Sequence, residues 1–274
     1  MAHFVHYVRR TVVEVNYEDP SDPWFAENQQ DNQGFDAPSY HVTRSLTGPA
    51  ARVSKGDTIW LFSKLTTPWG NFPPALDAKI VVRGKPIHTH AFDQKTPVIR
   101  YKADARDSKW FPLYNAAPCI QDLWTKDVKG NSQRLLSNED QPIGQALQAM
   151  RELSDVEPLL KLERELDATP FDFISYRLID GTRLAFDQAI QRVEEGGAVF
   201  WDRWSLPRRL AERREFLSDY SLDSYILKQI YQCKTLWAIH STRYAEPGSY
   251  SACEMYLAQR LGKLQIIRSK RTNF

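Results

Sequence analysis

The hydrophobic pattern of this 274-residue chain changes near residue 169, and this change constrains the fold most. Beyond it, short apolar runs alternate with amphipathic stretches. The first run, Phe171 to Ile174, follows a Thr-Pro break and ends in Ser175-Tyr176-Arg177. An apolar run that opens into polar residues is typical of a buried parallel strand. Because ligands of open α/β sheets bind beyond the carboxyl ends of the strands, we expect any site to include this tripeptide.

The same alternation continues to the end of the chain. We predict a helix with Asp180 as its N-cap, ended by Gly196-Gly197. Further strands are predicted at 198–202, 235–241 and 263–268, further helices at 222–233 and 249–261, and an irregular Arg-rich segment at 203–221. Repeated strand–helix–strand units predict a parallel sheet with helices on both faces.

The first half is predicted to be rich in β-strands. Strands are expected at 3–16, 58–62, 76–82 and 96–101, with a polar loop at 17–40. Short strands with Pro- and Gly-rich turns favour a small barrel. The turn Ser54-Lys55-Gly56-Asp57, with the strands after it, resembles PUA-type barrels, including the EVE branch. That resemblance implies a module that binds a modified base or nucleotide.

Helical spacing appears before the change in pattern. Residues 111–125 are predicted to hold a short helix. Over 141–166 the apolar residues recur at three- and four-residue intervals, with a break at Asp155 to Pro158, so we predict two helices or one kinked helix. We place the domain boundary after them, giving a β-rich domain at 1–168 and an α/β domain at 169–274.

Composition excludes several classes of protein. Hydrophobic residues make up 42% and charged residues 26%, as in globular proteins. The net charge of +2 does not by itself require a nucleic acid partner. No apolar run approaches the roughly 20 residues that span a bilayer, so no membrane partner is expected. The three cysteines are too widely spaced for a disulfide framework or a zinc site, and a reducing cytoplasm is the expected compartment.

Four pieces of the second half recur in a characteristic order. They are Phe173-Ile174-Ser175-Tyr176-Arg177, Val199-Phe200-Trp201-Asp202, His240-Ser241 with Tyr244 after it, and Ser249-Tyr250-Ser251-Ala252-Cys253-Glu254. Together, over 170–272, they resemble the TIR domain family. The last piece resembles the family's serine-x-tryptophan-cysteine-x-x-glutamate box, with Tyr250 in the tryptophan place and Ser251 in the cysteine place. The long segment after Asp202 is a further departure.

The resemblance implies a flavodoxin-like sheet and an enzyme that cleaves NAD into nicotinamide and ADP-ribose or a cyclic product. NAD would be the substrate; no cofactor and no metal are implied. The family's catalytic glutamate corresponds to Glu254. A carboxylate suits this reaction because loss of nicotinamide leaves an oxocarbenium-like ribose.

Five other residues are candidates for binding NAD. They are Ser175, Tyr176, Arg177, Trp204 and Tyr250. An arginine at the loop entrance can meet a phosphate, a tyrosine one turn before Glu254 can stack on nicotinamide, and a loop tryptophan can gate a site. Four of them have a structural alternative: a surface ion pair for Arg177, packing for Tyr250, loop anchoring for Trp204 and backbone capping for Ser175.

By resemblance, we expect an effector of prokaryotic antiviral defence that becomes active through association of its TIR domains. The first half would be a sensor or adaptor, with a nucleotide or nucleic acid as its trigger. Two other hypotheses stay open: a non-enzymatic TIR interaction scaffold, and a nucleoside-transferring enzyme on a related fold. A metal site at His88, His90 and Asp93 is a weak alternative, since surface histidines fit equally.

Overall fold

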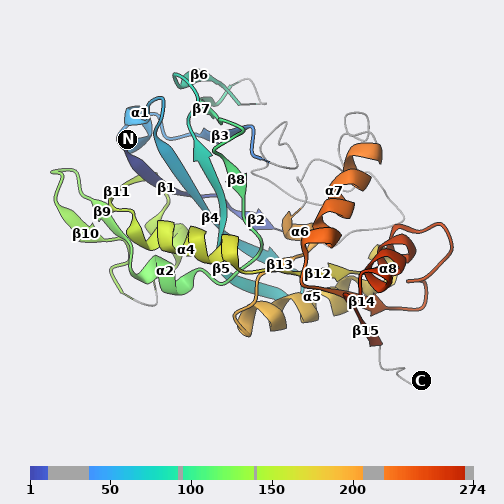
Figure 1. The fold of residues 1–274 in the computed structure, drawn as a ribbon. Helices are drawn as coiled ribbons and strands as arrows, with labels where there is room; N and C mark the ends of the chain where they lie inside the picture. Colours follow the sequence, from blue (N-terminus) through green and yellow to red (C-terminus); the bar gives the residue numbers. More distant parts are fainter. Residues whose placement is uncertain (12–36, 92–94, 139–140, 206–218, 269–274) are drawn as a thin grey trace.

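The computed structural model describes residues 1–11, 37–91, 95–138, 141–205 and 219–268, and it is a mixed α/β structure (Figure 1). The first half is built on an eight-stranded mixed sheet of order β10-β9-β11-β1-β4-β5-β8, with β2 paired to β4. Its strands are β1 (His3–Tyr7), β2 (Arg10–Thr11), β4 (Thr58–Thr67), β5 (Gly70–Val81), β8 (Lys109–Trp110), β9 (Trp124–Lys126), β10 (Ser132–Arg134) and β11 (Arg151–Asp155).

Both faces of strand β4 are buried. Ile59 and Leu61 pack into one core cluster, and Trp60 and Phe62 pack into another on the opposite face. The smaller sheet, β3 (Tyr40–Thr43), β7 (Pro97–Lys102) and β6 (Ile87–His90), contributes to the first of these cores. An isolated bridge joins Val82 to Ala103 and so links the two sheets. A closed, PUA-like barrel stays a prediction.

The helices of the first half are mostly short. They are α1 (Pro49–Arg52), α2 (Ala117–Gln121), α3 (Ile143–Ala146) and α4 (Glu157–Ala168). Helix α4 buries Leu159, Leu162 and Leu166, as its apolar spacing predicted. The predicted strand at 3–16 forms only as β1 and β2, and residues 12–36 of the predicted strand and loop lie outside the described residues.

The prediction of continuous helix over 141–153 is wrong. Helix α3 has four residues, and β11 follows it, paired antiparallel with both β1 and β9. The apolar residues that suggested one helical stripe face two different cores: Leu147 and Leu153 join Trp60, whereas Met150 joins Ile59. One stripe of a helix faces one side of a sheet, whereas the short helix, the connecting residues and the strand found here direct these side chains to both sides.

The second half is a parallel sheet of order β13-β12-β14-β15, as the sequence predicted. Its strands are β12 (Asp172–Ser175), β13 (Val199–Phe200), β14 (Thr235–His240) and β15 (Leu264–Arg268); its helices are α5 (Leu178–Glu194), α6 (Asp202–Ser205), α7 (Asp219–Gln232) and α8 (Tyr250–Arg260). Figure 1 shows α5 on one side of this sheet and α7 and α8 on the other. Consecutive residues of β12 face opposite sides and confirm two buried faces. Ile174 packs with α5, and Phe173 packs with α7 and α8.

The start of α5 differs from the prediction. The helix begins at Leu178, so Asp180 lies in its first turn and is not the N-cap. The carboxylate of Asp180 instead accepts hydrogen bonds from the Ser241 hydroxyl at 2.6 Å and the Arg243 amide at 3.0 Å. A carboxylate in the first turn still benefits from the positive end of the helix dipole.

The two halves share a hydrophobic core. Leu65 and Phe72 of the first half pack in one cluster with Phe186 and Trp201 of the second. The backbones of Leu113 and Val199 also exchange two hydrogen bonds, of 2.9 and 2.8 Å. The proposed boundary at residue 169 falls between α4 and β12, and this core crosses it. No helix of the described residues has the length and apolarity needed to cross a bilayer.

Candidate functional site

Three side chains converge at the carboxyl end of β12. The Ser175 hydroxyl lies 2.5 Å from a carboxylate oxygen of Glu254 and 2.6 Å from the hydroxyl of Tyr244. Because serine has one proton and donates it to the carboxylate, Tyr244 is the donor to Ser175. Ser175 and Tyr244 are fully buried, whereas Glu254 is partly buried. We call Tyr244, Ser175 and Glu254 the inner relay.

The sequence around α8 explains how Glu254 reaches this position. Ser249 caps the helix by accepting a hydrogen bond from the Ala252 amide at 3.2 Å. Ser251 donates to the carbonyl of Tyr244, which fixes the first turn against the loop after β14. Ser251, Glu254 and Ala258 follow helical spacing, and both Ser251 and Ala258 are buried, so Glu254 lies on the face toward the sheet.

The electrostatic surroundings of Glu254 are unusual for a glutamate. Burial raises its pKa to about 7; the Ser175 hydrogen bond opposes that rise, and the negative charge of Asp202 adds to it. Within the described residues, no lysine or arginine forms an ion pair with this carboxylate. Its pKa therefore lies close to neutral pH, and no cation among the described residues cancels its charge.

A second cluster lies beside the relay at the end of β13. The Tyr176 hydroxyl donates to Asp202 at 2.6 Å and accepts from the Arg203 guanidinium at 3.1 Å. Burial, followed by the charge of Asp202, raises the pKa of Tyr176 well above its ordinary value. These contacts hold Tyr176 to the first two residues of α6.

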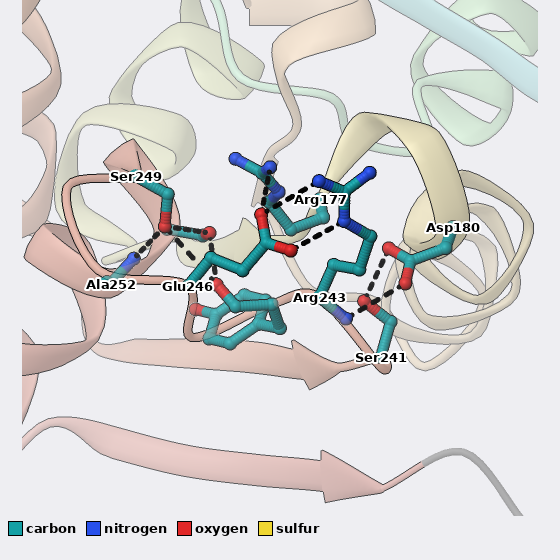
Figure 2. A network of polar contacts seen from close by, with 9 residues as sticks. Arg177, Asp180, Ser241, Arg243, Glu246, Ser249 and Ala252 are labelled. Carbon is teal, nitrogen blue, oxygen red and sulfur yellow. Dashed lines mark hydrogen bonds and ion pairs between the residues drawn. The ribbon is translucent and has the colours of Figure 1, made fainter.

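An exposed ion network lies at the same edge of the sheet (Figure 2). Arg177, just after β12, donates to Glu246 at 2.9 Å. Arg243, just after β14, donates to the same carboxylate at 2.6 and 3.2 Å. We call Arg177, Arg243 and Glu246 the outer network. It gives Arg177 the ion pair that the sequence left open as an alternative to phosphate binding.

The remaining predicted site residues, Trp204 and Tyr250, differ in exposure. Trp204 is 2% exposed, and its indole donates to the carbonyl of Phe111 at 3.0 Å, so it anchors α6 to the first half. Tyr250 is 51% exposed at the first position of α8, one turn before Glu254. The ring of Tyr250 is therefore reachable from solvent, whereas that of Trp204 is not.

The metal hypothesis finds no support in the described part of the chain. His88 and His90 are exposed on β6, and Asp93 lies outside the described residues. In the ranges that the structure describes, no three histidine, cysteine or acidic side chains gather as metal ligands would.

Sequence reasoning missed several residues of the site. Tyr244 served only as a marker of the third piece, and Asp202 only ended the second. Arg243 and Glu246 were assigned to a loop without a role. One signal could have found them: all four follow the carboxyl ends of β13 or β14, where residues of a parallel sheet meet ligands.

The chain was compared with family models, with curated proteins and with solved structures, and none of the three comparisons gave a match.

Proposed function

We propose that this chain is a TIR-type NAD glycohydrolase, which cleaves NAD into nicotinamide and either ADP-ribose or a cyclic ADP-ribose product. The observation that carries the proposal is Glu254: a desolvated carboxylate with no ion pair among the described residues, held by Ser175 at the edge of a parallel sheet where ligands bind.

The chemistry suits such a carboxylate. In this reaction the bond between ribose C1′ and the nicotinamide nitrogen breaks, the nitrogen takes the electron pair, and positive charge develops on the ribose. A fixed negative charge in a poorly solvated place stabilises that charge far better than one in water. Water then adds to C1′ and releases a proton, or a nucleophile of the ADP-ribose itself closes a ring.

Sheet order also supports the proposal. The order β13-β12-β14-β15 reads 2-1-3-4 when the strands are numbered from residue 169, which is how the flavodoxin-like doubly wound order begins. With Glu254 at the ribose, Tyr250 is near enough along α8 to stack on nicotinamide, and Ser175, Tyr176 and Arg177 line the end of the strand. Trp204 contributes indirectly by holding α6.

The biological setting follows from the same resemblance. We propose an effector of prokaryotic antiviral defence that acts in the cytoplasm, and whose sites become active when TIR domains associate. The first half would then detect a nucleotide or nucleic acid trigger. The core shared by Phe72, Phe186 and Trp201 is a physical connection through which such a trigger can influence the site.

The test is release of nicotinamide from NAD by the purified full-length chain, followed by chromatography over a wide range of protein concentration. We expect release to rise more steeply than protein concentration, and Glu254→Gln to lower it at least about 100-fold. Glu194→Gln is the matched control, because Glu194 is exposed near the end of α5.

Two outcomes would contradict the proposal. Equal, background release by the wild type and Glu254→Gln at the highest concentration would favour the interaction scaffold. Release of base from a nucleoside, with none from NAD, would favour the nucleoside-transferring enzyme.

A further inference from the structure

The outer network has the composition of an anion-binding site that is already occupied. Its two guanidinium groups come from the ends of neighbouring parallel strands: Arg177 is the second residue after β12, and Arg243 is the third after β14. Both therefore lie at the ligand-binding edge. Figure 2 shows the two side chains turned toward one carboxylate, that of Glu246.

The contacts show that both arginines can hold one oxyanion together. Arg243 binds both oxygens of Glu246, at 2.6 and 3.2 Å, and Arg177 binds one of the same oxygens at 2.9 Å. A phosphate presents the same planar pair of oxygens to a guanidinium group as a carboxylate does. Glu246 supplies one negative charge between the two arginines, and the carboxylate of Asp180 acts on Arg243 as well.

Glu246 is held weakly enough to be replaced. The side chains of Arg177, Glu246 and Arg243 are 28%, 39% and 49% exposed. Ion pairs at such exposure are screened by water and contribute little to stability. The loop does not depend on them alone, because Asp180 separately binds the Arg243 amide and the Ser241 hydroxyl.

The arginines of the outer network are close in sequence to residues of the inner relay, after both β12 and β14. Arg177 follows Ser175 by two residues, and Arg243 directly precedes Tyr244. A ligand bound by both arginines therefore lies at the same end of the sheet as the inner relay.

We propose that Arg177 and Arg243 form the subsite for the diphosphate of the substrate, and that Glu246 occupies this subsite in the free chain as an internal competitor. The identity of the diphosphate as that of NAD rests on the proposed function. Binding then exchanges a carboxylate of one negative charge for a diphosphate of two, and Glu246 limits affinity for phosphate groups that lack the rest of the substrate.

The test is calorimetric titration of ADP-ribose, and separately of inorganic pyrophosphate, into the Glu254→Gln chain, which binds without turnover. In that background we expect Glu246→Gln to tighten ADP-ribose binding about 5- to 10-fold and Arg243→Gln to weaken it about 10-fold. The matched controls are Glu157→Gln and Arg164→Gln, which break an exposed ion pair on α4. Thermal unfolding of each variant verifies that it is folded.

The outcomes separate this inference from the proposed function. If Glu246→Gln weakens binding or leaves it unchanged, or if neither probe binds any variant, the subsite is overturned. Release of nicotinamide by the wild type with KM unaffected by Arg243→Gln also overturns it. If the probes bind as expected while the wild type releases no nicotinamide, the subsite stands and the glycohydrolase proposal fails.

Discussion

Each half of the molecule buries a carboxyl group, and the two are treated differently. In the first half, Asp77 is 3% exposed, lies 3.3 Å from the Arg10 guanidinium and accepts a hydrogen bond of 2.8 Å from Ser63. In the second half, Glu254 has the Ser175 hydroxyl and no ion pair within the described residues. Burial raises the pKa of both groups, but the charge of Arg10 opposes the rise for Asp77.

The difference separates a structural carboxylate from one available for chemistry. The charge of Asp77 is already balanced by Arg10, and neither side chain is reachable from solvent. Among the described residues no cation forms an ion pair with Glu254, and its side chain is partly exposed. Unbalanced burial costs stability, so it is tolerated where a ligand uses the charge.

Breaking the structural pair should have the largest effect. Asp77→Asn leaves the buried Arg10 charge without its counter-ion, so we expect the free energy of unfolding to fall by about 3–5 kcal/mol. Urea unfolding followed by tryptophan fluorescence measures the loss. The double variant Arg10→Met with Asp77→Asn should recover most of it, because a buried ion pair exchanged for apolar groups is often neutral. A single variant as stable as the wild type would show that the pair does not hold the fold.

Replacing Glu254 by a neutral residue should raise the free energy of unfolding, whereas replacing Asp77 lowers it. Its pKa is raised from 4.5 to about 7, so the stability that it contributes is fully present below pH 4.5 and is lost as the pH rises through 7. We expect Glu254→Gln to be more stable than the wild type at pH 8 by about 1–3 kcal/mol, and equal to it at pH 4. Urea midpoints at both pH values test this; a less stable variant at pH 8 would contradict the raised pKa.

The pH dependence of activity sharpens the contrast further. If ionised Glu254 acts on NAD, release of nicotinamide should rise with pH through about 7. Ser175→Ala removes a hydrogen bond that lowers this pKa, so it should move the rise to higher pH and reduce release at pH 7 about 10-fold. Asp202→Asn removes a charge that raises the pKa and should move the rise to lower pH.

Tyr244→Phe is the control for these two variants, because it keeps the contact between Ser175 and Glu254. Tyr244→Phe should leave the pH midpoint of nicotinamide release nearer to the wild-type value than Ser175→Ala does. Shifts of Ser175→Ala and Asp202→Asn in the same direction would mean that the rise reports a group other than Glu254.

The sequence predicted the second half better than the first, for a physical reason. Buried parallel strands are continuous apolar runs, so β12 and β14 stand out from the segments around them. The segment around β11 does not, because Met150, just before the strand, and Leu153, within it, pack into cores on opposite faces and mimic helical spacing. The alternation of strands and helices in the second half has no such ambiguity.

The site was predictable only in part. Ser175 was predicted because it ends an apolar strand, and Glu254 because its helix start resembles the last box of the TIR family; the structure brings the two together. Their contact, and the contact of Ser175 with Tyr244 across 69 residues, depend on how the loop after β14 folds. The pairing of Glu246 with both arginines depends on the same loop, and no local pattern encodes it.

Trp204 contacts Arg10, the partner of Asp77, and its replacement should have the smallest effect. Arg10 lies 4.0 Å over its ring, its indole binds the Phe111 carbonyl, and its neighbour Asp202 acts on Glu254. Trp204→Phe keeps a ring for Arg10 but loses the hydrogen bond, so the free energy of unfolding should fall by about 1 kcal/mol. KM for NAD should stay unchanged, because a buried anchor does not meet substrate. A raised KM at unchanged stability would show instead that Trp204 gates the site.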